Sequence, residues 1–270
     1  MAFQHTISHS VEIEGIGLHT GRPCRLRLNP AAAGDGLTFL LDGRTVPARA
    51  EFVISTQRAM VLGKNGRQVS TVEHLLASLN AMGIDNVSAE VEGPEIPIID
   101  GSAVIFVEKI REAGKKRLMK EAPVLHLRTP LWVSGEDDLL LALPSPALRL
   151  TYMGDFPGLG FQQRSLSISP KIFAEQIAPA RTFVSQEQIQ SVLTQGLGQG
   201  GSLENVVVLG GERPSTPLRF ADEPLRHKLL DLLGDMALLG KGLQAHIIAI
   251  RSGHRLNLEL VKKLREAETR

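Results

Sequence analysis

The chain has 270 residues, 43% of them hydrophobic and 22% charged, and its 30 basic residues nearly balance 29 acidic ones. This composition is typical of a globular protein with a sizeable core in one large or two medium domains, and a formal charge of +1 gives no reason to expect nucleic acid as a partner. The single cysteine, Cys24, excludes an internal disulfide and any metal site built from several cysteines, and it favours a reducing, cytoplasmic location.

The N-terminus has neither the basic start nor the apolar core of a secretory signal. Apolar runs such as residues 206–209 and 246–250 are too short to span a bilayer. We therefore expect a cytoplasmic protein without stable membrane insertion, and a monomer is the default oligomeric state.

The first half of the chain is expected to hold short strands and two helices. Alternating apolar residues predict a strand at residues 6–14, followed by the glycine-punctuated loop GIGLHTG at residues 15–21. In this loop His19 is interpreted as a histidine that bonds nearby backbone. Further strands are expected at residues 22–28, 37–41, 45–48 and 86–92, and helices at residues 72–82 and 103–113.

The charged segment at residues 114–123 is interpreted as a linker, which divides the chain into domains at residues 1–120 and 121–270. Strands are then expected at residues 124–127, 139–143, 148–152, 163–168, 205–209 and 243–250. Helices are expected at residues 170–177, 186–193, 224–240 and 255–266.

The helix expected at residues 224–240 carries the most informative spacing. His227, Asp231 and Asp235 follow one another at intervals of four residues. Side chains at i and i+4 lie above one another on a helix, so this helix can direct an imidazole and a carboxylate to a single point. A surface ion pair is the alternative interpretation of His227 with Asp231.

The two halves of the chain share a sequence pattern. In each half a histidine-bearing helix is followed by a strand, a glycine and a second helix, and Gly101 and Gly253 follow His74 and His227 by 27 and 26 residues. This repeat predicts an α+β fold of two similar two-layer domains, with the helices of both sandwiched between the sheets. A cleft between the domains could then draw residues from each.

The repeat places His74 in a position related to that of His227. A catalytic zinc typically has three protein ligands and an open position for water, and His74, His227 and Asp231 meet this requirement without cysteine. Glu73 next to His74 could act as a general base. Histidine and aspartate accept either Zn²⁺ or Fe²⁺, so both remain open for one site per chain.

Several motifs occur in a fixed order, namely TVEHLLASLNAMGIDN, PEIPIIDGSA, ARTF, GLGQGGS, RHKLLDLLGD and SGH. In this combination the chain resembles the UDP-3-O-acyl-N-acetylglucosamine deacetylases, the zinc enzymes of lipid A synthesis. The resemblance implies two α+β domains, each with an insert, that sandwich their helices. It also implies zinc bound by His74, His227 and Asp231, with Glu73 as the general base.

Further catalytic roles follow from the same resemblance. His254 of SGH would be the general acid and would stabilise the oxyanion, and Asp235 would hold it in position. Thr182 of ARTF would hydrogen-bond the tetrahedral intermediate, and Lys228 would assist near the site. From the residues alone, His254 is a turn residue and Thr182 a loop hydroxyl bonded to backbone.

The resemblance assigns substrate contacts as well. Phe156 would stack on uracil and Arg251 would face the pyrophosphate, where the arginine fork suits phosphate. An insert at about residues 177–209 would form the apolar passage for the acyl chain, with Leu18, Phe183 and the helix at residues 186–193 as candidates for its wall. Met60 is a further candidate for a substrate contact. Core packing is the alternative account of the apolar residues.

The expected function is zinc-dependent hydrolysis of the N-acetyl group of UDP-3-O-(3-hydroxyacyl)-N-acetylglucosamine, which releases acetate in the committed step of lipid A biosynthesis. The expected partner is therefore a small-molecule UDP-acyl-sugar. Two alternatives are a relative that binds the nucleotide sugar without turnover and a zinc hydrolase that acts on another amide. The presence of Glu73, of all three ligands and of His254 argues against the first alternative.

Overall fold

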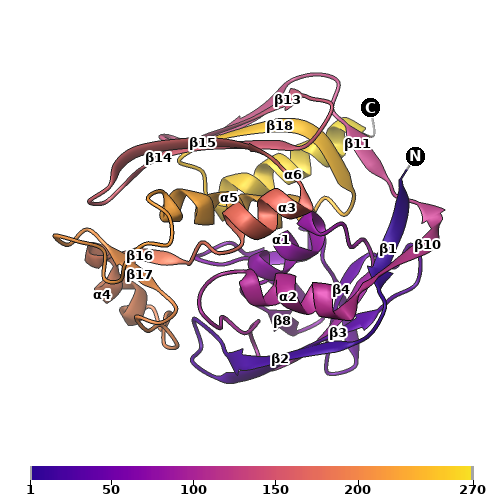
Figure 1. Ribbon diagram of the computed structural model, residues 1–270, viewed down its shortest axis with the longest axis horizontal. Coiled ribbons are helices and arrows are strands. Elements are labelled where there is room, and N and C mark those ends of the chain that lie inside the picture. The colour runs from indigo at the N-terminus through magenta and orange to yellow at the C-terminus, as the bar shows by residue number, and fades with distance from the viewer. Residues whose placement is uncertain (1, 269–270) are drawn as a thin grey trace.

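Two mixed β-sheets form the outer layers of the molecule, and the long helices fill the space between them (Figure 1). The computed structural model describes residues 2–268. Each half of the chain contributes one sheet and its covering helices, so the fold is α+β with two-layer units, as the sequence predicts. Within the described residues, no helix combines the length and the apolar character needed to cross a membrane.

The N-terminal half forms a five-stranded sheet whose middle strand, β9, is the last of its strands in the sequence. Strand β4 is parallel to β9, and the other pairings are antiparallel. Two helices, α1 (Glu73–Ala81) and α2 (Val104–Ala113), precede and follow β9 in the chain. The strand order is β2 (Val11–Ile16), β3 (Pro23–Pro30), β9 (Val87–Glu92), β4 (Leu37–Leu41) and β5 (Arg44–Pro47).

The C-terminal half repeats this connectivity around β18. Strand β14 is parallel to β18, β13 is antiparallel to it, and α5 (Glu223–Ala237) and α6 (His254–Glu268) flank it in the chain. The strand order is β12 (Leu131–Ser134), β13 (Leu139–Pro144), β18 (Gly242–Ile250), β14 (Arg149–Phe156) and β15 (Gly160–Ser167), and β11 (Val124–His126) also pairs with β18. The shared order of hairpins, central strand and helices confirms the expected likeness of the two units.

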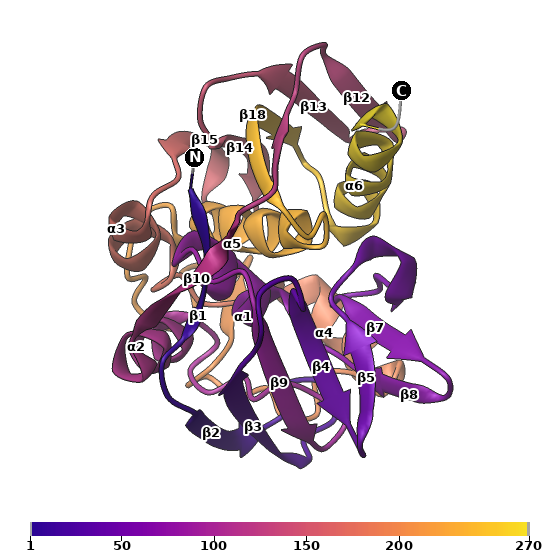
Figure 2. The ribbon, with the colours of Figure 1, turned by 90° about the vertical axis from the view of Figure 1, so that its right-hand side faces the viewer.

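Helices α1 and α5 pack against each other at the centre of the molecule (Figure 2). Their apolar faces follow from sequence periodicity, and Leu75, Leu79, Leu229 and Leu233 are almost completely buried. Helix α5 is buried on nearly all sides, so its polar residues lie in the interior. Burial of a charged group lowers stability unless the group is paired or binds a metal, so the buried charged residues of α5 need such partners.

Two expectations near the N-terminus and at the domain boundary are wrong. The strand expected at residues 6–14 is interrupted and forms β1 (Phe3–Ile7) and β2. The segment interpreted as a linker is mainly β10 (Lys115–Glu121), which pairs antiparallel with β1 (Figure 2). A strand at the edge of a fold can keep its charged side chains in solvent. The scarcity of apolar residues in β10 therefore did not prevent it from pairing with β1.

Each half carries an additional segment. In the first half, the short helix η1 (Ala50–Phe52) precedes a three-stranded sheet of β6 (Val53–Ser55), β7 (Val61–Lys64) and β8 (Arg67–Val69). In the second half, α3 (Pro170–Ile172) and the π-helical segment η2 (Phe173–Ile177) lead to β16 (Phe183–Ser185), α4 (Gln186–Thr194) and β17 (Val207–Leu209). Strands β16 and β17 are parallel and, with α4, project at the left of Figure 1.

Candidate metal centre and active site

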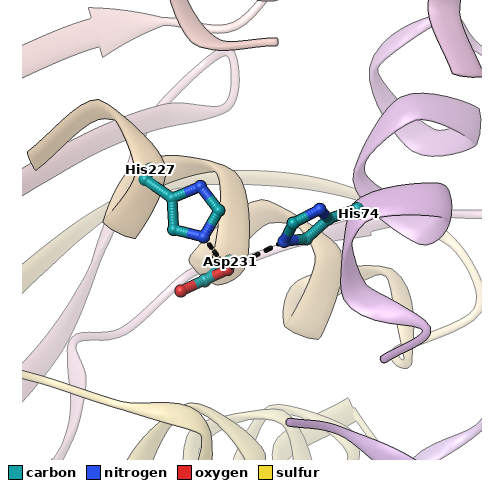
Figure 3. A group of neighbouring side chains, drawn as sticks. All are labelled: His74, His227 and Asp231. Atoms are coloured by element: carbon teal, nitrogen blue, oxygen red, sulfur yellow. Dashed lines mark ion pairs between the residues drawn. The ribbon is translucent and has the colours of Figure 1, made fainter. Parts of the chain in front are cut away.

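The first turn of α1 and the middle of α5 bring three potential metal ligands together (Figure 3). Asp231 Oδ1 lies 3.4 Å from His227 Nε2 and 3.9 Å from His74 Nε2. One donor atom from each residue lies within 4.8 Å of the other two. Donors at this separation can close on one ion, whose bonds to nitrogen and oxygen are about 2.0–2.2 Å long.

The three residues are at most 5% exposed, which excludes the surface ion pair considered for His227 and Asp231. Burial lowers the pKa of both imidazoles, that of His74 to about 3. Although burial alone would raise the pKa of Asp231, Lys228 and His227 hold it below its usual range. Two neutral imidazoles and one carboxylate are the protonation states that metal binding requires.

Hydrogen bonds with neighbouring groups fix the orientation of two of the potential metal ligands, His227 and Asp231. His227 Nδ1 lies 3.0 Å from the Ala180 carbonyl oxygen, which can only accept, so this nitrogen carries the proton and Nε2 presents its lone pair. Lys228 Nζ donates to Asp231 Oδ2 at 2.9 Å, which leaves Oδ1 directed at the histidines. A cation site supported in this way has the outer contacts typical of metal centres.

Glu73 lies beside this cluster and is 3% exposed. Its Oε2 accepts a hydrogen bond of 3.1 Å from the Met60 amide, and its Oε1 lies 3.8 Å from His254 Nε2. Burial raises the pKa of Glu73 to about 8, although His254 opposes the shift. A carboxylate with a pKa near neutrality can both take and release a proton at working pH.

His254 begins α6 and is held by α5. Its Nδ1 donates to Asp235 Oδ2 at 2.7 Å, and Asn257 Nδ2 donates to the same oxygen at 2.8 Å. Burial alone would lower the pKa of His254, but Asp235 and Glu73 raise it to about 9. The raised pKa favours the protonated imidazole at neutral pH, and this imidazole faces the Glu73 carboxyl group, an arrangement suited to general acid–base chemistry.

Thr182 and Phe183 lie where the ARTF segment enters β16. The Thr182 amide donates to the Gly101 carbonyl at 2.8 Å, which joins the two halves of the chain. The Phe183 ring lies 6.2 Å from the His227 ring and 5.7 Å from the Phe156 ring, measured between centroids. The aromatic pair therefore extends from the metal ligands toward the segment that contains α4.

A cavity of about 370 Å³ lies next to Phe183. It is bounded by the GIGLHTG loop, by β16, β17 and α4, and by the loop that follows α4. Its apolar lining is formed by Leu18, Phe183, Val184, Ile189, Val192, Leu193, Leu203, Val206 and Val208, and its polar lining includes His19, Arg58, Thr182 and Ser202. The residues expected to line an apolar passage thus surround one space.

The other candidate substrate contacts differ in their exposure and in the residues that surround them. Met60 is completely buried and reaches the site through its backbone amide on Glu73. Phe156 is 6% exposed and packs against Phe183. Arg251 is exposed, adopts φ 53°, and lies with Asp138 and Arg255 along a second, more open hollow.

Several supporting residues were missed by the sequence interpretation. Arg181 Nε and amide both donate to Glu223, at 2.8 and 3.0 Å, which anchors the segment that presents Ala180 to His227. Both members of the pair are buried. Charged residues are usually exposed, so the sequence around Arg181 and Glu223 does not indicate that the two side chains are buried and paired. Asn257 is also buried, although asparagine, like the charged residues, is usually exposed.

His19 also differs from its expected environment. It lines the cavity, and neither of its ring nitrogens makes a hydrogen bond within residues 2–268. Burial lowers the pKa of His19, although Glu95 opposes the shift. Both ring nitrogens are themselves buried, so the polar atoms of the imidazole are shielded from solvent.

Comparison with known proteins identifies the family. The family model described as UDP-3-O-acyl N-acetylglycosamine deacetylase matches residues 4–266, which include every candidate site residue. The UDP-3-O-acyl-N-acetylglucosamine deacetylase of Thermosynechococcus vestitus is 45% identical over 97% of this chain and 93% of its own length. The chain belongs to this deacetylase family. Its relatives are hydrolases by name.

Deacetylases of the same name from two further bacteria match over similar shares of the chain. The protein of that name from Geotalea uraniireducens is 42% identical over 98% of this chain and 89% of its own length. The one from Chlamydia muridarum is 40% identical over 98% of this chain and 95% of its own length. The match therefore covers both halves of the fold and the centre between them.

Proposed function

We propose that this deacetylase family member hydrolyses the N-acetyl group of UDP-3-O-(3-hydroxyacyl)-N-acetylglucosamine and releases acetate, in the committed step of lipid A biosynthesis. The names of its relatives support the substrate class. The observation that carries the proposal is the convergence of His74, His227 and Asp231 between Glu73 and His254. This arrangement would combine a cation site, a base and an acid in one buried place.

His74, His227 and Asp231 would hold one divalent ion per chain, Zn²⁺ or Fe²⁺. Their neutral imidazoles, buried carboxylate and backbone-fixed tautomer support this role. When bound, such an ion supplies a Lewis acid for the amide carbonyl and lowers the pKa of water in its vicinity.

Glu73 is proposed to take a proton from the attacking water. The Met60 amide holds one of its oxygens, and the other faces His254. His254, held protonated by Asp235, is proposed to give a proton to the leaving amine and to stabilise negative charge before that transfer. Each proton donor or acceptor is thus supported by a second group that fixes its orientation.

Two further groups are proposed to act on the developing oxyanion. Thr182 lines the cavity, and its hydroxyl is proposed to donate a hydrogen bond to the oxyanion. Lys228 lies between Asp231 and the Phe183 ring, with Nζ 5.8 Å from the ring centroid. Preorganised donors and charges of this kind stabilise negative charge without reorganisation.

The apolar cavity is proposed to receive the acyl chain of the substrate, with Leu18 and Phe183 in its wall. Its lining between β16 and α4 supports this assignment. Phe156 is proposed to stack on uracil and Arg251 to face the pyrophosphate, because an exposed guanidinium can bind phosphate through two parallel hydrogen bonds. Met60 is proposed to contact the substrate near Glu73.

The remaining assignments concern the protein as a whole. We propose domains at residues 1–120 and 121–270, each with one sheet and two helices of the central layer. We also propose that the protein works in the cytoplasm as a monomer on a small-molecule substrate. The formal net charge of +1 and the single cysteine support the proposed cytoplasmic location.

The test is acetate release from UDP-3-O-(3-hydroxymyristoyl)-N-acetylglucosamine by the zinc-loaded protein. The wild type and Glu108→Ala, which removes an exposed carboxylate of α2, should release acetate at similar rates. Glu73→Ala should retain zinc and lose about 10²–10⁴-fold in kcat, the usual contribution of a general base. Zinc binding by the wild type without acetate release would contradict the proposal and favour a nucleotide-sugar binding protein.

A further inference from the structure

Glu95 is a completely buried carboxylate that no step above uses. It lies in the extended residues 94–98, which bridge Ser70 on one side and Gly17 on the other. Its two oxygens accept hydrogen bonds from the His19 amide at 3.0 and 3.1 Å. Oε2 also accepts from the amide and hydroxyl of Thr20 at 3.0 and 2.9 Å. One side chain therefore fixes the turn of the GIGLHTG loop.

The same carboxylate also binds Thr71, which lies two residues before the start of α1. Thr71 Oγ1 donates to Glu95 Oε1 at 2.7 Å. Thr71 has φ 59°, a conformation that is unfavourable for a β-branched residue and persists only where its surroundings enforce it. Glu73 and His74 follow Thr71 by two and three residues. Glu95 thus connects the loop at the cavity to the helix of the base and the metal ligand.

The GIGLHTG loop, which Glu95 binds, also forms backbone hydrogen bonds with the loop that contains Gln199 and Gly200. The Gly200 amide donates to the Leu18 carbonyl at 2.9 Å, and the Gln199 amide donates to the His19 carbonyl at 3.2 Å. Glycine is required on both sides of this contact. A Cβ on Gly17 would stand 2.2 Å from Glu95 Oε2, and a Cβ on Gly200 would stand 2.2 Å from the Gly17 carbonyl oxygen.

The groups at Glu95 differ from those of an ordinary structural ion pair. They are two backbone amides and two hydroxyls, and no lysine or arginine forms an ion pair with Glu95 within residues 2–268. A carboxylate is the only side chain that offers acceptors alone on two oxygens. Loss of this group would leave two backbone amides and two hydroxyls without their acceptor, so the loop geometry depends on it.

We propose that Glu95 is a positioning residue, which sets the cavity wall at Leu18 and His19 against the start of α1. Through the backbone bonds of Gln199 and Gly200 it also sets the second-half loop that closes the cavity. The carboxylate itself does not touch the reacting atoms. It determines the relative position of the acyl-chain cavity and the catalytic base.

The test compares amide hydrogen exchange in zinc-loaded wild type, Glu95→Gln, Glu95→Ala and Glu92→Gln. Glu92→Gln is a matched control, because Glu92 is an exposed carboxylate three residues away. The Glu95 variants should lose protection at residues 17–21 and also at Gln199 and Gly200, which do not contact Glu95, with Glu95→Ala affected more than Glu95→Gln. Zinc content should stay at the wild-type level.

Unchanged exchange at Gln199 and Gly200 would overturn the proposal, and so would a uniform rise over the whole chain, which indicates general destabilisation. Glu95→Gln keeps the size of the side chain, so it decides the matter if Glu95→Ala fails to fold. The exchange readout does not depend on catalysis.

A second readout rests on the proposed function. In Glu95→Gln the kcat/KM for the acylated UDP-sugar should fall by about tenfold, the equivalent of about 1.4 kcal/mol, because the cavity and the base are displaced relative to each other. A kcat/KM within about twofold of the wild-type value would overturn the positioning role. If the wild type released no acetate, the proposed function would fail, and the exchange experiment would still decide the role of Glu95.

Discussion

Gly234 of α5 lies directly against the backbone of Glu73 in α1. A Cβ at position 234 would stand 2.1 Å from the Glu73 carbonyl oxygen. Only glycine permits this approach, which brings the helix that carries His227 and Asp231 against the helix that carries His74. The geometry of the proposed metal centre therefore depends on a residue without a side chain.

Gly234→Ala should push the two helices apart. We expect the free energy of unfolding to fall by about 1–3 kcal/mol, as for other overpacked cores, and zinc affinity to fall with it. Denaturant unfolding and zinc titration measure the two effects. Gly253→Ala is the matched control for stability, because a Cβ there meets no atom within 4 Å. Equal stability of the two variants would contradict the close approach of α1 and α5.

Asp235→Asn should change the pH dependence of the reaction. Asp235 raises the pKa of His254 to about 9 against the effect of burial, so the acid stays protonated at neutral pH and is lost as the pH rises through that value. Asparagine removes the charge, and the alkaline limb of the kcat profile should move to lower pH. The measurement is kcat against pH for both proteins. An alkaline limb at the same pH would contradict the acid role of His254.

Glu223→Gln should destabilise the segment that presents Ala180 and Thr182. The variant leaves Arg181 buried without its carboxylate, and breaking such a pair costs about 3–5 kcal/mol in unfolding free energy. Although burial alone would raise the pKa of Glu223, Arg181 lowers it. The contribution to stability is therefore present above about pH 4.5, the unfolded-state pKa, and is lost as the pH falls through the folded-state pKa.

The measurement for this pair is denaturant unfolding at pH 7 and at progressively lower pH. The difference between wild type and Glu223→Gln should be largest at pH 7 and shrink below about pH 4.5. The control is Glu112→Gln, which removes the exposed partner of Lys109 and should change stability by less than about 1 kcal/mol. A difference that stays constant with pH would contradict the ion pair.

The sequence predicts the elements that local periodicity defines. The four-residue spacing of His227 and Asp231 placed both on one helix face, and the repeat related His74 to them. The sequence does not reveal that α1 and α5 touch at Gly234, because this close approach depends on tertiary packing. Partners such as Glu95 with Thr71 bring together residues 24 positions apart. Such pairs have no periodic signature, and buried charges resemble surface charges in sequence.

The pairing of β1 with β10 illustrates the same limit. The two strands are separated by more than 100 residues, and β10 is rich in lysine. A local reading of its composition indicates a linker, whereas the backbone groups of β1 pair with it. Strand pairing at this separation is determined by the whole fold and only weakly by the residues of either strand.

The most direct test of the central claim is zinc titration of the metal-free protein, with wild type compared to His227→Ala and to His126→Ala, which removes an exposed histidine. The account predicts one tightly bound zinc per chain for the wild type and His126→Ala. Affinity should fall by more than about 100-fold in His227→Ala, because loss of a ligand exceeds the effect of losing an outer contact. Equal stoichiometry and affinity in His227→Ala would contradict the metal centre between α1 and α5.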